Sequence, residues 1–249
     1  MVKNVKGLVL KEVKVGDADK IITILTDEMG KISASVKGAA NLKSRRIGGT
    51  KPFCFSKFSL NERGGRFYVS EAAIEENFFA INESIEKLAL ASYFLELCAF
   101  TSSELEPAND ALRLTLNGLF LLTKNDKPLP VIKAAYELRL LSSIGHMPDL
   151  TCCSVCASYE KNMLFDIKEG ILVCAGCASG TAGTLRLPLK TSVLKAMRHI
   201  IYSDENKIFS FELSDEGMTN LSSCVESYIL TQLDSGFKTL NFYKSVINT

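Results

Sequence analysis

Four cysteines have the spacing of a metal site. They form two pairs, Cys153 with Cys156 and Cys174 with Cys177, and 17 residues separate the pairs. Two residues between thiols let backbone amides turn toward the sulfurs, and a spacer of about 15–20 residues is typical of a four-cysteine zinc ribbon. The spacing therefore predicts one structural Zn²⁺ held by four thiolates, with no open coordination position for catalysis.

Disulfides and a thioredoxin-like redox pair are the alternatives for these cysteines. Redox use is disfavoured because neither pair opens a helix after a strand in a βαβ context. Cys152 adjoins the first ligand and would replace it if the register shifted by one, but Cys153 keeps the two-residue spacing. The other three cysteines, Cys54, Cys98 and Cys224, have the sequence context of small buried apolar residues.

A second chemical pattern is a stretch from Gly30 to Asn61 that contains no acidic residue. Alternating residues at its start predict a strand with one apolar and one cationic face, followed by a glycine-flanked loop and an aromatic strand. Cations on such a loop suit a phosphodiester backbone, whereas the alternative is a loop that its charge merely keeps solvated. The predicted phosphate contacts of this stretch and the next strand are Lys31, Lys37, Lys43, Arg45, Arg46, Lys51 and Arg66.

The charges are distributed unevenly along the chain. Residues 1–80 have a net charge of +5 and the remainder −4, although the whole chain of 249 residues has only +1. This asymmetry indicates a polyanion contact at the N-terminal end alone.

Several classes of protein are not expected. No run reaches the ~18 apolar residues of a membrane span, and the first residues lack the apolar core of a signal peptide, so a cytoplasmic protein is expected. The chain has two histidines and no phosphate loop, nucleophile elbow, HExxH motif or recognisable carboxylate pair. We therefore do not expect an enzyme.

The elements that carry these residues divide the chain into an all-β part and a helical part. Residues 1–78 predict about five short antiparallel strands, which make a small barrel of the OB type; an SH3-like barrel is the competitor. Three aromatic residues of this part, Phe53, Phe55 and Tyr68, either stack on bases or belong to the barrel core. From residue 79 to residue 249 the apolar period becomes about 3.6, which predicts a helical domain with the zinc-binding insert at residues 150–182.

The ordered combination of these features resembles the bacterial RecO family of DNA repair and recombination mediators. The positions that carry the resemblance span nearly the whole chain: residues 24–31, 36–39, 43–45, 52–53 and 136–141, then Gly145, Pro148, Asp149, Leu150 and Gly170 around the cysteine pairs. Two departures are Ala40 and Asn41, where the family often has basic residues, and the additional thiol of Cys152.

The resemblance implies a non-enzymatic role. Members of the family bind single- and double-stranded DNA, anneal complementary strands, and help load recombinase onto strands coated by single-stranded DNA-binding protein. It further implies RecR and, in many cases, RecF as partners, and contact between the helical domain and the acidic tail of single-stranded DNA-binding protein. Lys133 and Arg139 are the candidates for that contact, with ordinary solvated helix charges as the alternative. The competing functions are a protein-interaction scaffold and a zinc-ribbon factor of RNA metabolism.

Overall fold

The computed structural model describes residues 2–39, 48–124, 126–159, 162–179 and 185–247. Contacts divide the chain into two compact units, one of residues 1–124 and 237–249, the other of residues 125–236. Within the described residues, no helix combines the length and apolar character needed to cross a membrane.

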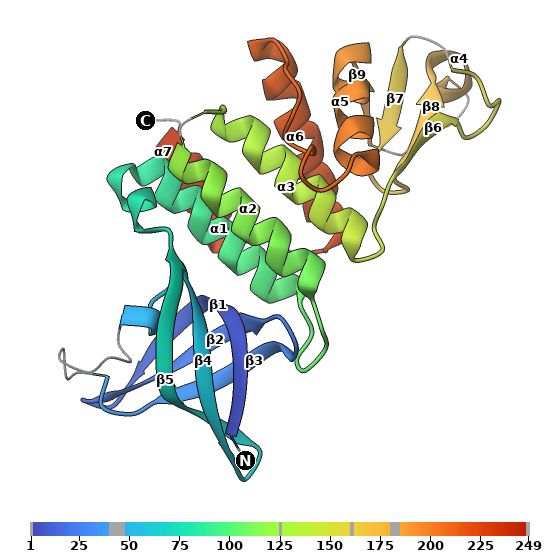
Figure 1. Cartoon of the computed structure of the whole chain (residues 1–249). Helices are drawn as coiled ribbons and strands as arrows, with labels where there is room; N and C mark the ends of the chain where they lie inside the picture. The colour runs from blue at the N-terminus through green and yellow to red at the C-terminus, as the bar shows by residue number, and fades with distance from the viewer. Residues whose placement is uncertain (1, 40–47, 125, 160–161, 180–184, 248–249) are drawn as a thin grey trace. The chain divides into compact units, whose positions relative to one another are not determined.

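The first unit begins with a closed five-stranded barrel of the OB type (Figure 1). Its strands, in the spatial order β1-β2-β3-β5-β4, are β1 (Val2–Val15), β2 (Asp19–Thr26), β3 (Gly30–Val36), β4 (Cys54–Arg63) and β5 (Arg66–Asn77). All neighbouring strands pair antiparallel except β3 and β5, which run parallel and close the barrel. The predicted barrel is therefore confirmed.

Alternating side chains fill the barrel. Ile22 and Ile24 from β2, Ala34 and Val36 from β3, and Phe58 from β4 belong to one buried cluster. Because successive side chains of a strand point to opposite faces, the intervening residues of β2 and β3 lie on the outside. This alternation fixes which residues of the barrel a ligand can reach.

Three helices complete the first unit: α1 (Ile85–Thr101), α2 (Asn109–Lys124) and α7 (Lys238–Ile247), with short 3₁₀ turns at Gly48–Thr50 and Phe79–Glu83. Ser84 accepts a hydrogen bond from the backbone N–H of Lys87 and so begins α1. The C-terminal α7 packs against α1, where the backbone N–H and hydroxyl of Thr239 both donate to the Glu96 carboxylate.

The second unit combines helices with a small sheet. Helix α3 (Leu129–Ser143) packs against α5 (Thr191–Tyr202) and α6 (Asp215–Gln232), and a four-stranded sheet has the order β6-β8-β7-β9. The sheet consists of β6 (Asp149–Cys153), β7 (Met163–Asp166), β8 (Ile171–Cys174) and β9 (Arg186–Leu189), and the short helix α4 (Ala175–Ala178) follows β8. The sheet is joined to the helices by Arg198 of α5, whose guanidinium donates to the carbonyls of Leu150 and Thr151.

Candidate metal centre and nucleic-acid interface

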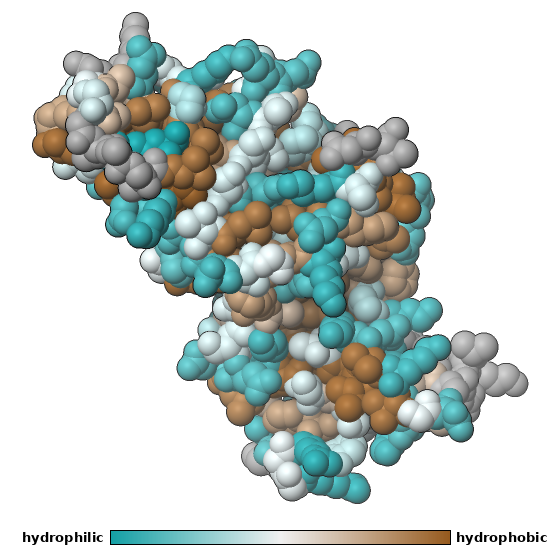
Figure 2. Space-filling view, turned by 180° about the vertical axis from the view of Figure 1, so that it is seen from behind, coloured by the Kyte–Doolittle hydropathy of each residue, from teal (hydrophilic) through white to brown (hydrophobic). Residues whose placement is uncertain are grey.

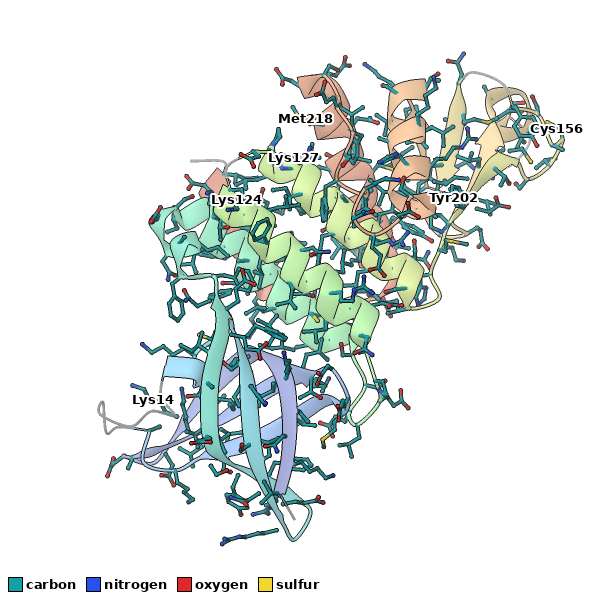
Figure 3. All side chains as sticks on the ribbon, viewed as in Figure 1. Lys14, Lys124, Lys127, Cys156, Tyr202 and Met218 are labelled. Carbon is teal, nitrogen blue, oxygen red and sulfur yellow. The ribbon has the colours of Figure 1, made fainter. Side chains whose placement is uncertain are left out.

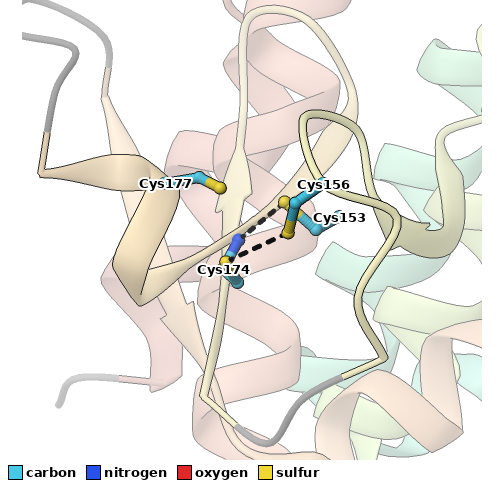
Figure 4. A group of neighbouring side chains, drawn as sticks. All are labelled: Cys153, Cys156, Cys174 and Cys177. Carbon is cyan, nitrogen blue, oxygen red and sulfur yellow. Dashed lines mark hydrogen bonds between the residues drawn. The ribbon is translucent and has the colours of Figure 1, made fainter.

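The four cysteines predicted as metal ligands come together in the second unit. Cys153 ends β6, Cys156 follows in the next turn, Cys174 ends β8 and Cys177 lies in α4. Their sulfur atoms all lie within 4.8 Å of one another, and those of Cys156 and Cys174 are 3.7 Å apart (Figure 4). A disulfide requires sulfurs about 2.05 Å apart, and all eight cysteines are free thiols, so the disulfide alternative is not realised.

The electrostatics of this cluster favour a bound cation. The backbone N–H of Cys174 donates to the Cys153 sulfur at 3.3 Å, and this bond lowers the pKa of the Cys153 thiol to about 6. By contrast, the thiols of Cys156 and Cys174 beside it raise the pKa of Cys177 to about 12. Four neighbouring thiols cannot all ionise without a counter-charge, and a divalent metal supplies that charge. The donor set suits a closed tetrahedral site, and Cys152, half-buried on β6, is not part of it.

The described lysines and arginine that were predicted to contact phosphates differ in their exposure and in the protein groups that already bind them. The Lys31 ammonium donates to the carbonyl of Ala99 at 2.7 Å and is thus engaged by the protein itself. Lys37 is 66% exposed but forms an ion pair with Asp19 at 2.7 Å. Lys51 and Arg66 are exposed. Lys43, Arg45 and Arg46 lie outside the described residues.

The barrel holds the chain on both sides of residues 40–47. Before them, Asp19 accepts from the backbone N–H of Gly38 as well as from Lys37, and these bonds lower the pKa of its carboxyl. After them, the buried Lys20 donates to the carbonyl of Thr50 at 2.8 Å and to Glu12 at 2.6 Å. Gly38 and Thr50 are therefore both bonded to residues of β2, contacts that the sequence alone did not indicate.

The three aromatic residues proposed to stack on bases are all half-buried. Tyr68 lies in register with Ser35 on the neighbouring strand, on the outer face of the barrel. Phe53 has a left-handed backbone with φ of 67°, and its N–H donates to the carbonyl of Val9. Phe58, by contrast, is fully buried in the barrel core.

A groove of about 460 Å³ follows the outer face of β3. We call it the β3 groove and define it by Ile21, residues 31–35, residues 65–67, Glu104 and Leu105. It occupies the face between β2 and the β4–β5 hairpin, which OB barrels commonly use for oligonucleotides. Sequence reasoning named only Lys31 and Arg66 of this set; the other side chains lack charge patterns that would have marked them.

The barrel also carries exposed cations that sequence reasoning did not single out. Lys11 and Lys14 extend from the end of β1, and Lys14 is labelled in Figure 3. They add positive charge to the β1–β2 hairpin, beside the outer face of β2.

The structure corrects the expectation that Lys133 is a surface charge. Its side chain is 1% exposed, and its ammonium lies 2.8 Å from Glu137 and 2.9 Å from Glu226. Burial alone would lower its pKa, but the attraction of the two carboxylates raises it above the ordinary value of 10.5. Arg139 is also engaged internally, since its guanidinium donates to the carbonyls of Ile200 and Ile201 in α5.

Together, the OB-type barrel, the helices and the four-cysteine centre define a class of protein that couples an oligonucleotide-binding fold to a metal-stabilised helical part. Comparison with known proteins gives the family. Residues 1–78 match the family described as "Recombination protein O N terminal", and residues 82–241 match "Recombination protein O C terminal".

Relatives named "DNA repair protein RecO" align along nearly their whole length. The protein of Acetivibrio thermocellus is 33% identical over 242 residues, which cover 96% of this chain and 95% of the relative. Those of Alkaliphilus metalliredigens and Desulforamulus reducens are 29% and 31% identical, over 99% and 96% of this chain and 100% and 94% of the relatives. The chain belongs to the RecO family of DNA repair proteins.

Proposed function

We propose that this protein is a non-enzymatic mediator of DNA repair and recombination. It binds single- and double-stranded DNA, anneals complementary strands, and helps load recombinase onto strands coated by single-stranded DNA-binding protein. RecR, single-stranded DNA-binding protein and RecF are its proposed partners, and it acts in the cytoplasm at the nucleoid. Membership of the RecO family supports each of these roles.

The observation that carries the DNA-binding proposal is the open outer face of the barrel. Its β3 groove is a ligand-sized recess on the face that OB barrels use for oligonucleotides, and exposed Arg66 lies at its edge. Lys37 and Lys51 lie on either side of residues 40–47, and their charges suit a phosphate backbone. The proposed phosphate contacts remain Lys31, Lys37, Lys43, Arg45, Arg46, Lys51 and Arg66, with Lys31 the weakest because Ala99 already binds its ammonium.

We propose Zn²⁺ as the metal of the four-cysteine centre. Four thiolates favour zinc among the abundant divalent ions, and the closed site would fold the insert at residues 150–182. Bound to one Zn²⁺, the thiolates carry a local charge of about −2. The proposed domains are residues 1–78 and residues 79–249, and the separate family matches to residues 1–78 and 82–241 support this division. The contacts divide the chain differently, because α1, α2 and α7 form one compact unit with the barrel.

Salt dependence tests the DNA-binding proposal. A fluorescent single-stranded oligonucleotide is titrated at several salt concentrations, and we expect affinity to fall with a log–log slope of about −0.7 per neutralised phosphate. Arg45→Ala with Arg46→Ala should flatten that slope by about 1.4 if each arginine neutralises one phosphate. Lys195→Ala, which removes an exposed cation of α5, is the matched control and should leave the slope unchanged. A slope near zero for the unaltered protein would refute the proposal.

Two further measurements separate the competing functions. Tighter binding to RNA than to DNA of the same sequence would favour the RNA-binding alternative. A stable complex with an acidic partner protein, without oligonucleotide binding, would favour the scaffold. The mediator predicts instead accelerated annealing of complementary strands and a complex with RecR.

A further inference from the structure

The four thiols of the metal centre differ in how far they are open to solvent. Cys153 and Cys174 are buried, with 1% and 4% of their surface exposed, and Cys177 is half-buried. Cys156 is exposed, in the turn after β6, where its neighbour Val155 is 69% exposed. Brown side chains reach the surface around this insert in the upper left of Figure 2. A solute as small as a peroxide can therefore reach Cys156 in the folded protein.

A second thiol lies close enough to react with an oxidised Cys156. The Cys174 sulfur is 3.7 Å away (Figure 4), and a disulfide needs about 2.05 Å, so the two sulfurs must approach by about 1.7 Å. The turn that carries Cys156 can supply this movement, because its residues 154–157 are all exposed. Its backbone at Ala157 is left-handed, with φ of 56°, a strained conformation for alanine that the turn can leave when the centre opens.

We propose that Cys156 is a site of oxidation by hydrogen peroxide, and that the oxidised residue forms a disulfide with Cys174 and so releases the metal. The inference rests on the proposed Zn²⁺ and adds to it a reaction of two of its ligands. Coordination to a metal keeps a thiol deprotonated, and the thiolate is the form that reacts with peroxides. All the cysteines are free thiols in the resting protein, so the centre begins in the reduced state.

The reaction balances in two steps. The Cys156 thiolate attacks one oxygen of the peroxide and breaks the O–O bond, which gives a sulfenic acid and a hydroxide ion. The Cys174 thiolate then attacks the sulfur of the sulfenic acid, so that an S–S bond forms and a second hydroxide leaves. The two thiolates have lost two electrons to the peroxide, and two protons from solvent convert the hydroxides to water. The two thiolates that remain no longer make a closed four-ligand site, and the metal leaves.

The loss of structure should be confined to the cysteine end of the insert. At the opposite end, the turn between β7 and β8 is bonded to α6, where Gln232 donates to the carbonyls of Ile167 and Lys168. Arg198 of α5 likewise holds β6. These bonds involve no sulfur and should survive oxidation. Helix α4 carries Cys177 and has only four residues, too few for a helix to be stable by itself, so it should unfold when the metal leaves.

The test treats the zinc-loaded protein with hydrogen peroxide and measures released zinc with a chromogenic chelator. Chelator without peroxide gives the background release. We expect zinc release to accompany a disulfide that fragment-ion mass spectrometry of unreduced peptides assigns to Cys156 and Cys174. Hydrogen exchange should increase at residues 152–159 and 174–179 and stay unchanged at residues 165–172. Reduction by a thiol, followed by added zinc, should restore the original exchange pattern.

Two variants separate the roles of neighbouring thiols. Cys156→His retains a metal ligand, since three cysteines and one histidine also form structural zinc sites, but it removes the exposed thiol. This variant should lose both the peroxide-dependent zinc release and the disulfide. Cys152→Ser is the matched control, because this cysteine lies outside the cluster, and it should react as the unaltered protein does. Cys54 and Cys224 are buried and should remain unoxidised in the same samples.

The outcomes distinguish this inference from the proposed metal centre. Absence of zinc from the purified protein would overturn the proposed Zn²⁺ and the inference with it. Zinc that is present but stays bound in peroxide would overturn the inference alone and leave the structural metal intact. Zinc release with a disulfide between other cysteines, or undiminished release from Cys156→His, would overturn the assignment to Cys156 and Cys174.

Discussion

Replacing Lys133 by methionine should destabilise the second unit strongly. Its ammonium lies within 3 Å of two carboxylates, and the Glu137 side chain is fully buried while that of Glu226 is 16% exposed. Removing one partner of a buried ion pair costs about 3–5 kcal/mol, because a charge is left in an apolar surrounding. Lys133→Met removes the counter-charge of both carboxylates, so we expect a loss within this range.

The assay is equilibrium unfolding in urea, followed by the helical circular dichroism signal. With a slope of about 2 kcal/mol per molar urea, a loss of 4 kcal/mol lowers the midpoint by about 2 M. The double variant Lys133→Met with Glu137→Leu is the control, since replacing a buried ion pair by apolar side chains of similar volume is often nearly neutral. We therefore expect the double variant to regain the part of the lost stability that comes from Glu137, while Glu226 still lacks the Lys133 ammonium.

The pH dependence of the free energy of unfolding gives a second test of the Lys133 ion pair. The folded pKa of Lys133 is raised above 10.5, so its contribution is fully present below pH 10.5 and is lost as pH rises through the folded value. The difference in stability between the unaltered protein and Lys133→Met should therefore be constant near neutral pH and shrink only in strong alkali. An unchanged urea midpoint for Lys133→Met, together with lost partner binding, would refute this reasoning and restore Lys133 as a surface contact.

Three other perturbations have defined outcomes. Cys156→Ser should abolish stoichiometric zinc, as measured by elemental analysis, and increase hydrogen exchange in residues 150–182, whereas Cys152→Ser should retain the metal. Gly30→Ala should lower the thermal midpoint by many degrees, because its Cβ would meet a backbone carbonyl 1.8 Å away; Gly64→Ala, with positive φ but open space, should cost only about 1 kcal/mol. Arg139→Met should destabilise the protein by about 1–3 kcal/mol in urea unfolding, since carbonyls of α5 lose a charged donor, and equal stability would contradict that role.

The features predicted correctly from the sequence depend on residues close together in the chain. The cysteine spacing determines which thiols share a turn, and the structure brings the same four thiols together in one cluster. Strand alternation similarly identified the buried face of β3. These sequence patterns depend on neighbouring residues, and the tertiary packing of the protein did not override the local structure that they predict.

The missed features depend on residues distant in sequence. Lys133 has an ordinary helical position, and its burial depends on Glu226 of α6, which no periodicity in α3 reveals. Lys31 is bound by Ala99, and the β3 groove is closed by Glu104 and Leu105, all of which lie beyond the barrel sequence. The packing of helix α7 against α1, which joins the end of the chain to the first unit, likewise depends on residues distant in sequence.

The engaged lysines change how the charge of the barrel should be interpreted. Lys20 is buried and binds Glu12 and the carbonyl of Thr50, so its charge stabilises the fold and is not available to a phosphate. Lys37 differs, because an exposed ion pair is worth about 0–1 kcal/mol and a phosphate can replace Asp19 as its partner. The salt slope for DNA binding should therefore be smaller than the count of lysines and arginines suggests. We therefore expect the cations that hold the barrel together to position the proposed binding face, and the exposed cations to determine its affinity for DNA.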